Sequence, residues 1–251
     1  MNLYLNGIED FSIVCADTLE HPAFLDGSHL RKFNIVLANP PYSIKEWNRE
    51  KFMNDKWGRN FLGTPPQGRA DYAFFQHILA SMNDQNGRCA ILFPHGVLFR
   101  DEEYELRKKL VEIDIVDCVI GLGPNLFFNA SMEACIIICK NRKEDSHKGK
   151  VIFIDAKGEV SRKNAESYLE NTHIQKIISA YENFEDIEYF AKVADIDDID
   201  NNKSLLSIQS YVKQKGTNEI YILDESLPKW IEVSRTMHIE VANLLSMLKY
   251  E

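Results

Sequence analysis

The sequence has few of the residues that mark fibrous, secreted or membrane proteins. Its 12 glycines and 8 prolines among 251 residues are too few for a fibrous or disordered chain. No apolar run reaches roughly 18 residues and no signal peptide is evident, so we expect no membrane association and a cytoplasmic location. With 45% hydrophobic residues, the chain is long enough for one or two domains with a real core.

Cysteine is also scarce, and its pattern argues against cross-links. The count of five is odd, and no C-x-x-C motif or nearby histidine pairing accompanies it. Disulfides and a zinc site are therefore not expected, and each cysteine lies in an apolar run, as reduced core thiols do. The five are Cys15, Cys89, Cys118, Cys135 and Cys139.

Basic residues are fewer than acidic residues. Lysine and arginine number 29 against 38 acidic residues, which gives a formal net charge of −9. A protein that binds nucleic acid by itself needs a basic face for the phosphates, so the composition argues against that class. The deficit is partly local, because residues 186–200 hold six acidic side chains against Lys192.

The most informative stretch is a strand that ends abruptly. The apolar run at residues 33–37 leads into residues 38–43, Ala-Asn-Pro-Pro-Tyr-Ser, where two prolines stop the ladder. The carboxyl end of a strand in an open parallel sheet faces the ligand crevice. Asn39 and Pro40 offer carbonyl acceptors there, and Tyr42 offers a flat ring. These groups suit the exocyclic amine of a planar base flipped out of a duplex.

This stretch and its surroundings resemble a known family. Residues 39–42 are similar to the NPPY motif of S-adenosylmethionine-dependent amino-methyltransferases. The chain as a whole resembles the modification subunit of type I restriction-modification systems, an adenine-N6 DNA methyltransferase, from the first residue to about Asp155 and more thinly beyond. The other matching stretches are MNLYLNGI (1–8), ADTL (16–19), ADYAFFQH (70–77), GRCAILFP (87–94), GVLFR (96–100) and NLFF (125–128).

The resemblance implies roles for individual residues in methyl transfer. The catalytic residues would be Asn39, Pro40 and Tyr42. Pro41 would contact the flipped adenine, as would Phe127 or Phe128, of which at least one is expected to pack in the core. Two acceptors on the amine would leave its lone pair free to attack an electrophile.

The resemblance also implies two residues near the cofactor, S-adenosyl-L-methionine. Asp17, after a short strand expected at residues 11–16, would contact the adenine amino group of the cofactor. Asp71, at the start of an expected helix, would lie close to the same pocket. From the residues alone, each aspartate is equally well explained as a turn or helix cap.

The order of elements predicts an α/β fold. Apolar runs at residues 88–94, 114–122, 134–140 and 151–155 alternate with helical patterns that start at Asp71 and Glu102. We expect a partial doubly wound, Rossmann-like methyltransferase sheet with an antiparallel C-terminal hairpin in residues 1–158. Residues 159–251 are expected to form a small, mostly helical appendage. Residues 44–70, rich in tryptophan and cations, form a loop that either contacts DNA or is a solvated flap pinned by its aromatics.

One family feature is absent. The glycine-rich turn of the type Asp-Pro-x-x-Gly-x-Gly, which holds the cofactor, and the acidic residue that holds its ribose occur nowhere in the chain. By the resemblance, the chain starts just before the third strand of the family sheet, and the NPPY strand is left with an open edge. We therefore expect a truncated form that lacks most of the methyl-donor half and is inactive by itself.

The partners implied are double-stranded DNA, the specificity and restriction subunits of a type I complex, and the missing N-terminal half. A helical apolar stripe near the C-terminus either engages the specificity subunit or packs on the chain's own domain; it consists of Ile231, Met237, Val241, Leu244, Leu245 and Leu248. Two other functions stay open. One is a non-catalytic binding or regulatory remnant, and the other is an amino-methyltransferase for protein glutamine or a small molecule.

Overall fold

The structure is a computed structural model that describes residues 2–127, 132–163 and 166–214, together with residues 231, 232, 234, 235, 237 and 240. Two compact units are distinguished, Met1–Lys213 and Gln214–Glu251. In the second unit the described residues after 214 are helical, and Ile231 and Met237 of the expected apolar stripe are exposed. The other four residues of that stripe lie outside the described part.

The first unit is built on a six-stranded mixed sheet in the order β10-β7-β5-β6-β4-β3. Its strands are β3 (Ile35–Ala38), β4 (Arg88–Pro94), β5 (Val116–Leu122), β6 (Ala134–Lys140), β7 (Lys150–Ala156) and β10 (Ala191–Asp195). Strands β3 and β4 are parallel, as are β5 and β7, whereas β6 is antiparallel to both of its neighbours. The expected α/β fold with an antiparallel hairpin is confirmed.

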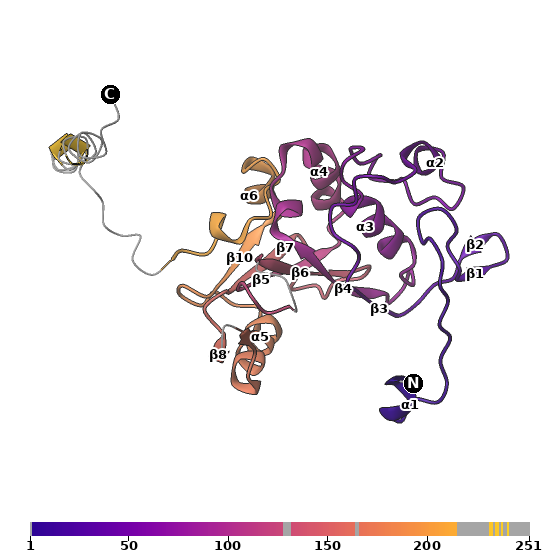
Figure 1. Ribbon diagram of the computed structural model, residues 1–251, viewed down its shortest axis with the longest axis horizontal. Helices are drawn as coiled ribbons and strands as arrows, with labels where there is room; N and C mark the ends of the chain where they lie inside the picture. The colour runs from indigo at the N-terminus through magenta and orange to yellow at the C-terminus, as the bar shows by residue number, and fades with distance from the viewer. Residues whose placement is uncertain are drawn as a thin grey trace, which may run out of the picture. The chain divides into compact units, whose positions relative to one another are not determined.

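Helices cover both faces of this sheet (Figure 1). On one face lie α3 (Asp71–Ala80), α4 (Tyr104–Glu112) and α6 (Ile196–Asn201), and on the other lies α5 (Asn171–Asn183). Strand β7 shows how the sequence makes two cores, because Val151 and Phe153 join the first while Ile152 and Ile154 join the second. Side chains that alternate along a strand point to opposite faces.

The remaining elements are short. They are α1 (Asn2–Leu5), β1 (Leu25–Asp26), β2 (His29–Leu30), α2 (Arg49–Met53), η1 (His95–Leu98), η2 (Asp101–Glu103), β8 (Ser161–Lys163), β9 (Glu166–Tyr168) and η3 (Ile208–Ser210). Strands β1 and β2 pair in one antiparallel hairpin, and β8 and β9 in another.

Three expectations about local structure differ from what is observed. Residues 11–16 form no strand, since the described part of the chain offers them no strand to pair with, and Ile13 is 75% exposed. Cys15 is accordingly exposed, whereas the other four cysteines are buried. In the acidic segment, β10 pairs with β7 and extends the sheet beyond residue 158. The functional division at residue 158 stays a prediction.

The end of the sheet at β3 is open in the described structure. β4 is the only strand paired with β3 in the described part of the chain. Ile35 is 55% exposed and Leu37 is 77% exposed, although both are large apolar side chains of a strand. The expected open edge of the NPPY strand is therefore present in this structure.

Candidate active site

The NPPY turn, residues 39–42, follows β3 directly. Asn39 and Pro41 are exposed, Pro40 is buried and Tyr42 is half-buried. The Tyr42 hydroxyl donates a hydrogen bond of 2.9 Å to Oδ1 of Asn39. Burial, and to a smaller degree Cys135, raise the pKa of Tyr42 above its ordinary value, so the phenol keeps its proton at neutral pH. The turn thus presents a polar amide beside an aromatic ring.

Ser43, the residue after the turn, has a left-handed backbone conformation with φ of 48°. A non-glycine residue adopts this conformation only when surrounding contacts compensate for it. The contacts come from Asp71 at the start of α3, whose Oδ1 accepts a 2.8 Å hydrogen bond from the Ser43 amide. Asp71 is fully buried, and its Oδ2 is 2.7 Å from Nη1 of Arg100. The structure therefore places Asp71 directly behind the NPPY turn.

A second buried carboxylate, Glu103, belongs to the same network. Its Oε2 lies 3.3 Å from Nη1 of Arg100, and its Oε1 has no hydrogen-bond partner among the described residues. Burial, opposed by Arg100, raises the pKa of Glu103 to about 7. One guanidinium therefore faces two carboxylates behind the turn, and one of these titrates near neutral pH.

Asp17 shapes a turn at residues 17–20, which we call the Asp17 turn. Its Oδ1 accepts hydrogen bonds of 2.9 Å from the amides of Leu19 and Glu20. This is the capping arrangement that short aspartate turns favour. Asp17 itself is exposed, so the same carboxylate is accessible to a ligand.

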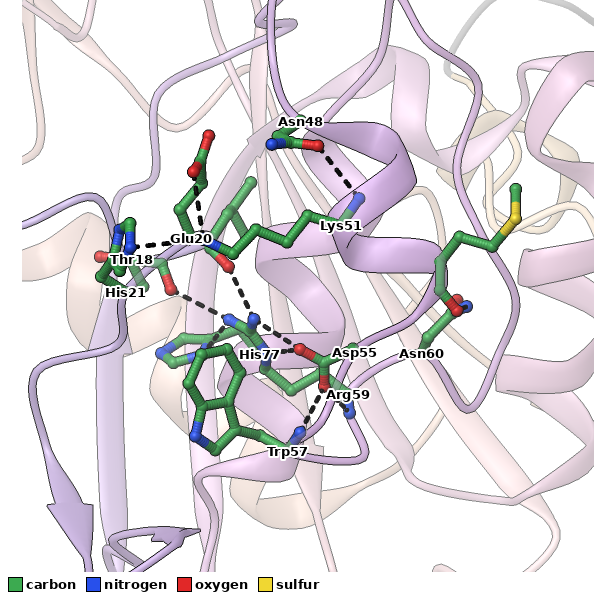
Figure 2. Close-up of polar contacts among 12 residues, drawn as sticks. Thr18, Glu20, His21, Asn48, Lys51, Asp55, Trp57, Arg59, Asn60 and His77 are labelled. Atoms are coloured by element: carbon green, nitrogen blue, oxygen red, sulfur yellow. Dashed lines mark hydrogen bonds and ion pairs between the residues drawn. The ribbon is translucent and has the colours of Figure 1, made fainter.

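Arg59, from the loop of residues 44–70, clamps the Asp17 turn from behind (Figure 2). Its Nη1 donates to the carbonyl of Thr18 at 2.9 Å and its Nη2 to that of Leu19 at 2.6 Å. Nη2 also lies 2.7 Å from Oδ1 of Asp55, and both side chains are only 1% exposed. Burial, then Arg59, lower the pKa of His77 to about 4, so its ring is neutral beside the guanidinium.

The loop of residues 44–70 is also tied to itself. Nε1 of Trp47 donates to the carbonyl of Gln67 at 2.6 Å, and Nε of Arg49 donates to that of Pro65 at 2.8 Å. Within it, α2 buries Phe52 against Leu19 and the start of α3. The loop is therefore pinned by its aromatic residues, while Lys45 and Lys56 stay exposed.

A cavity of about 520 Å³ lies between the NPPY strand and turn, the segment around Asp17 and α3. Its walls include Ala16, Thr18, Asn39, Pro40, Pro41 and Phe74. Ile35 and Leu37 of β3 also line it, so the space opens onto the uncovered edge of the sheet. The NPPY turn and the residues that flank Asp17 thus border one space. A volume of this size is typical of pockets for small ligands and cofactors.

Other groups lie at the same edge of the sheet. Phe127 follows the carboxyl end of β5, is half-buried and packs against the core on the α5 face; Phe128 lies outside the described residues. His95, just after β4, has Nε2 2.9 Å from the carbonyl of Ala134. Burial, then Lys157, lower its pKa below the ordinary value. Because β3, β4, β5 and β7 run in one direction, their carboxyl ends meet here.

Sequence reasoning gave no role to Arg100 or Glu103. It counted Arg59 among the loop cations that could contact DNA, whereas Arg59 is buried behind the Asp17 turn. Arg100 and Glu103 lie 29 or more positions from Asp71, and Arg59 lies about 40 positions from the turn it clamps. No spacing rule connects such residues. The one available signal was the stretch Gly96 to Arg100, which resembles the family.

Comparison with known proteins identifies the lineage. The family model described as N-6 DNA Methylase matches residues 1–220. The chain belongs to this family. A type I restriction enzyme methylase subunit, MjaVII of Methanocaldococcus jannaschii, is 30% identical over 250 residues, which are 94% of this chain and 42% of that protein. The HindI methylase subunit of Haemophilus influenzae is 32% identical over 87% of this chain and 49% of its own length.

A solved structure agrees with this fold. The type I restriction-modification methyltransferase subunit from Streptococcus thermophilus aligns with a TM-score of 0.70 and 39% identity, over 78% of this chain and 41% of that one. The resemblance to type I modification subunits is therefore confirmed. The chain spans less than half the length of these three relatives. No helix in the described residues is long and apolar enough to cross a bilayer.

Proposed function

We propose that this chain supplies the methyl-acceptor part of an adenine-N6 DNA methyltransferase, acting as the modification subunit of a type I restriction-modification system. The observation that carries the proposal is the NPPY turn, an exposed amide next to a half-buried tyrosine, held from behind by Asp71 and bordering a cavity of cofactor size. Membership of the N-6 DNA methylase family supports the chemistry.

In this proposal the turn acts on the exocyclic amine of an adenine flipped out of the duplex. Oδ1 of Asn39 and the carbonyl oxygen of Pro40 accept the two amine hydrogens. Those hydrogen bonds draw the two hydrogens out of the ring plane, so the nitrogen lone pair leaves conjugation with the ring and is free to attack. Tyr42 and Pro41 pack against the base, and Phe127 or Phe128 closes it from the hairpin side. The amine nitrogen forms a bond to the methyl carbon as the sulfonium–methyl bond breaks, and it then loses one proton to water.

The residues present fit part of a bound S-adenosyl-L-methionine. The cavity of about 520 Å³ is bordered by Ala16 and Thr18, and the exposed Asp17 between them can accept a hydrogen bond from the adenine amino group of the cofactor. When bound, the cofactor supplies the methyl group from its sulfonium. Asp71, expected close to this pocket, contributes by holding Ser43, since its buried carboxylate already has partners.

The proposed partners follow from the family and from the open side of the sheet. Double-stranded DNA is the substrate, and the exposed Lys45 and Lys56 of the loop can contact its phosphates. Specificity and restriction subunits complete the assembly. The exposed β3 edge, with Leu37 uncovered, takes a further strand from polypeptide beyond these 251 residues, whether continuous with them or separate.

The test is methyl transfer by a reconstituted assembly. The chain is combined with the polypeptide that supplies the rest of a type I methylase subunit and with a specificity subunit, and it is given duplex DNA and methyl-labelled cofactor. We expect N6-methyladenine by mass spectrometry, and none with Asn39→Ala. Label on a glutamine peptide but not on DNA would favour the protein or small-molecule amino-methyltransferase. No transfer by any assembly would favour a binding or regulatory module.

A further inference from the structure

Arg100 lies behind the NPPY turn and contacts Ser43, Asp71 and Glu103. Its Nη1 is 2.7 Å from Oδ2 of Asp71 and 3.3 Å from Oε2 of Glu103, and its Nη2 is 3.4 Å from Oγ of Ser43. The side chain is only 16% exposed. The guanidinium therefore connects the residue that follows the turn with the start of α3 and with η2.

The path from Arg100 to the turn is short. Asp71 accepts the Ser43 amide, and Ser43 has the left-handed conformation that directs the chain out of the turn. A buried carboxylate keeps its charge, and so its strength as an acceptor, only when a cation is paired with it. Removing Arg100 would leave Asp71 uncompensated and loosen its bond to Ser43.

Gly96 shows that room is made for this guanidinium. A Cβ built on Gly96 would lie 2.5 Å from Nη2 and 2.7 Å from Cζ of Arg100, much closer than atoms pack. Any larger residue at position 96 must push the guanidinium aside. The glycine thus has a specific function, because it allows the Arg100 side chain to lie against its backbone and reach Asp71.

We propose that Arg100 is the positioning residue of the NPPY turn: through Asp71 and Ser43 it fixes Asn39 and Pro40 in the geometry that accepts the amine. The role rests on the proposed methyl transfer, but the contacts that define it belong to the chain alone. Arg100 touches neither base nor cofactor in this account. Its effect is on the reaction rate, since an acceptor pair displaced by an ångström loses much of its alignment.

The first experiment uses the 251-residue chain and needs no activity. Hydrogen exchange is measured for the peptide that contains Ser43 in the wild type and in Arg100→Met, Arg100→Lys and Gly96→Ala. We expect exchange to be at least about tenfold faster in Arg100→Met and Gly96→Ala, and intermediate in Arg100→Lys, because lysine offers one point charge in place of a fork. Unchanged exchange in both Arg100→Met and Gly96→Ala would overturn the proposal.

A matched control separates this effect from general loss of a buried cation. The Lys143 side chain is 2% exposed, and its Nζ lies 2.6 Å from Asp114 and 2.7 Å from the carbonyl of Lys150. This cluster lies beyond the carboxyl end of the antiparallel β6, away from the NPPY edge. Lys143→Met should lower stability and leave Ser43 exchange unchanged. Faster exchange of the Ser43 amide in Lys143→Met would show that loss of any buried cation loosens the turn, and it would overturn the specific role of Arg100.

The second experiment measures kinetics in the reconstituted assembly. In Arg100→Met we expect kcat to fall roughly 10- to 100-fold with KM for DNA within about threefold, the signature of a lost transition-state alignment. A rise in KM at unchanged kcat would assign Arg100 to DNA binding and refute the positioning role. If the wild type transfers no methyl group, the proposed function fails, and the exchange result still decides whether Arg100 holds the turn.

Discussion

Replacing Glu103 by glutamine should change how the stability of the chain depends on pH. The folded chain raises the pKa of this buried carboxyl to about 7 from an ordinary 4.5. A raised pKa favours the protonated form in the fold, so Glu103 stabilises the chain fully below pH 4.5, and this contribution is lost as the pH rises through 7. The difference between the two pKa values corresponds to about 3 kcal/mol.

The assay is urea unfolding of the wild type and of Glu103→Gln at several pH values between 5 and 8. Glutamine resembles the protonated carboxyl and does not titrate. As the pH rises, the wild type should therefore lose stability relative to the variant, by up to about 3 kcal/mol in the free energy of unfolding. Glu102→Gln, at the exposed neighbouring position, serves as the control. If the free energies of unfolding of the wild type and of Glu103→Gln differed by a constant amount across this range, the reasoning would be refuted. Such a result would mean that Glu103 has the same pKa in the folded and in the unfolded chain.

Three further predictions concern the turn, the clamp and the sheet edge. In the reconstituted assembly, Tyr42→Phe should reduce methyl transfer much less than Tyr42→Ala, since phenylalanine loses only the hydrogen bond to Asn39 and keeps the ring; equal losses would contradict a stacking role. Arg59→Met should cost roughly 3 to 5 kcal/mol in urea unfolding because it leaves Asp55 as a buried unpaired charge, and an Arg59→Met, Asp55→Leu double variant should recover much of it. Leu37→Lys should change the free energy of unfolding by no more than about 0.5 kcal/mol from the wild type, because the Leu37 side chain is 77% exposed. It should also reduce self-association in sedimentation velocity. A large loss of stability would show that Leu37 is packed in solution.

The sequence predicted those strands whose apolar runs are flanked by turn residues. Residues 88–94 and 134–140 are apolar runs between turn residues, and the structure has strands with the same bounds. Helix α3 begins at Asp71 as expected. Residues 11–16 have an equally apolar pattern but form no strand, because a strand also needs a neighbour to pair with.

Strand β10 was not predicted, because its sequence has little strand pattern although it has a neighbour to pair with. Its short sequence lacks a period-two apolar pattern, since Ala191 and Ala194 are buried in different cores, and pairing with β7 decides its structure. At the candidate site, a motif located the NPPY turn and the resemblance pointed to Asp17, and the roles of both stay predictions. The supporting residues could not be found in this way, because their contacts with Asp71 and with the Asp17 turn span tens of positions and depend on the tertiary fold.

The uncovered β3 edge also has a consequence for the amount of this protein in a cell. A strand that leaves Leu37 and Ile35 in water is the kind of surface that chaperones and proteases recognise on orphan subunits. A copy whose edge is covered escapes that surveillance, and a copy in excess of its covering strand does not. Where the covering strand belongs to a separate polypeptide, the amount of this chain would then follow the supply of that polypeptide.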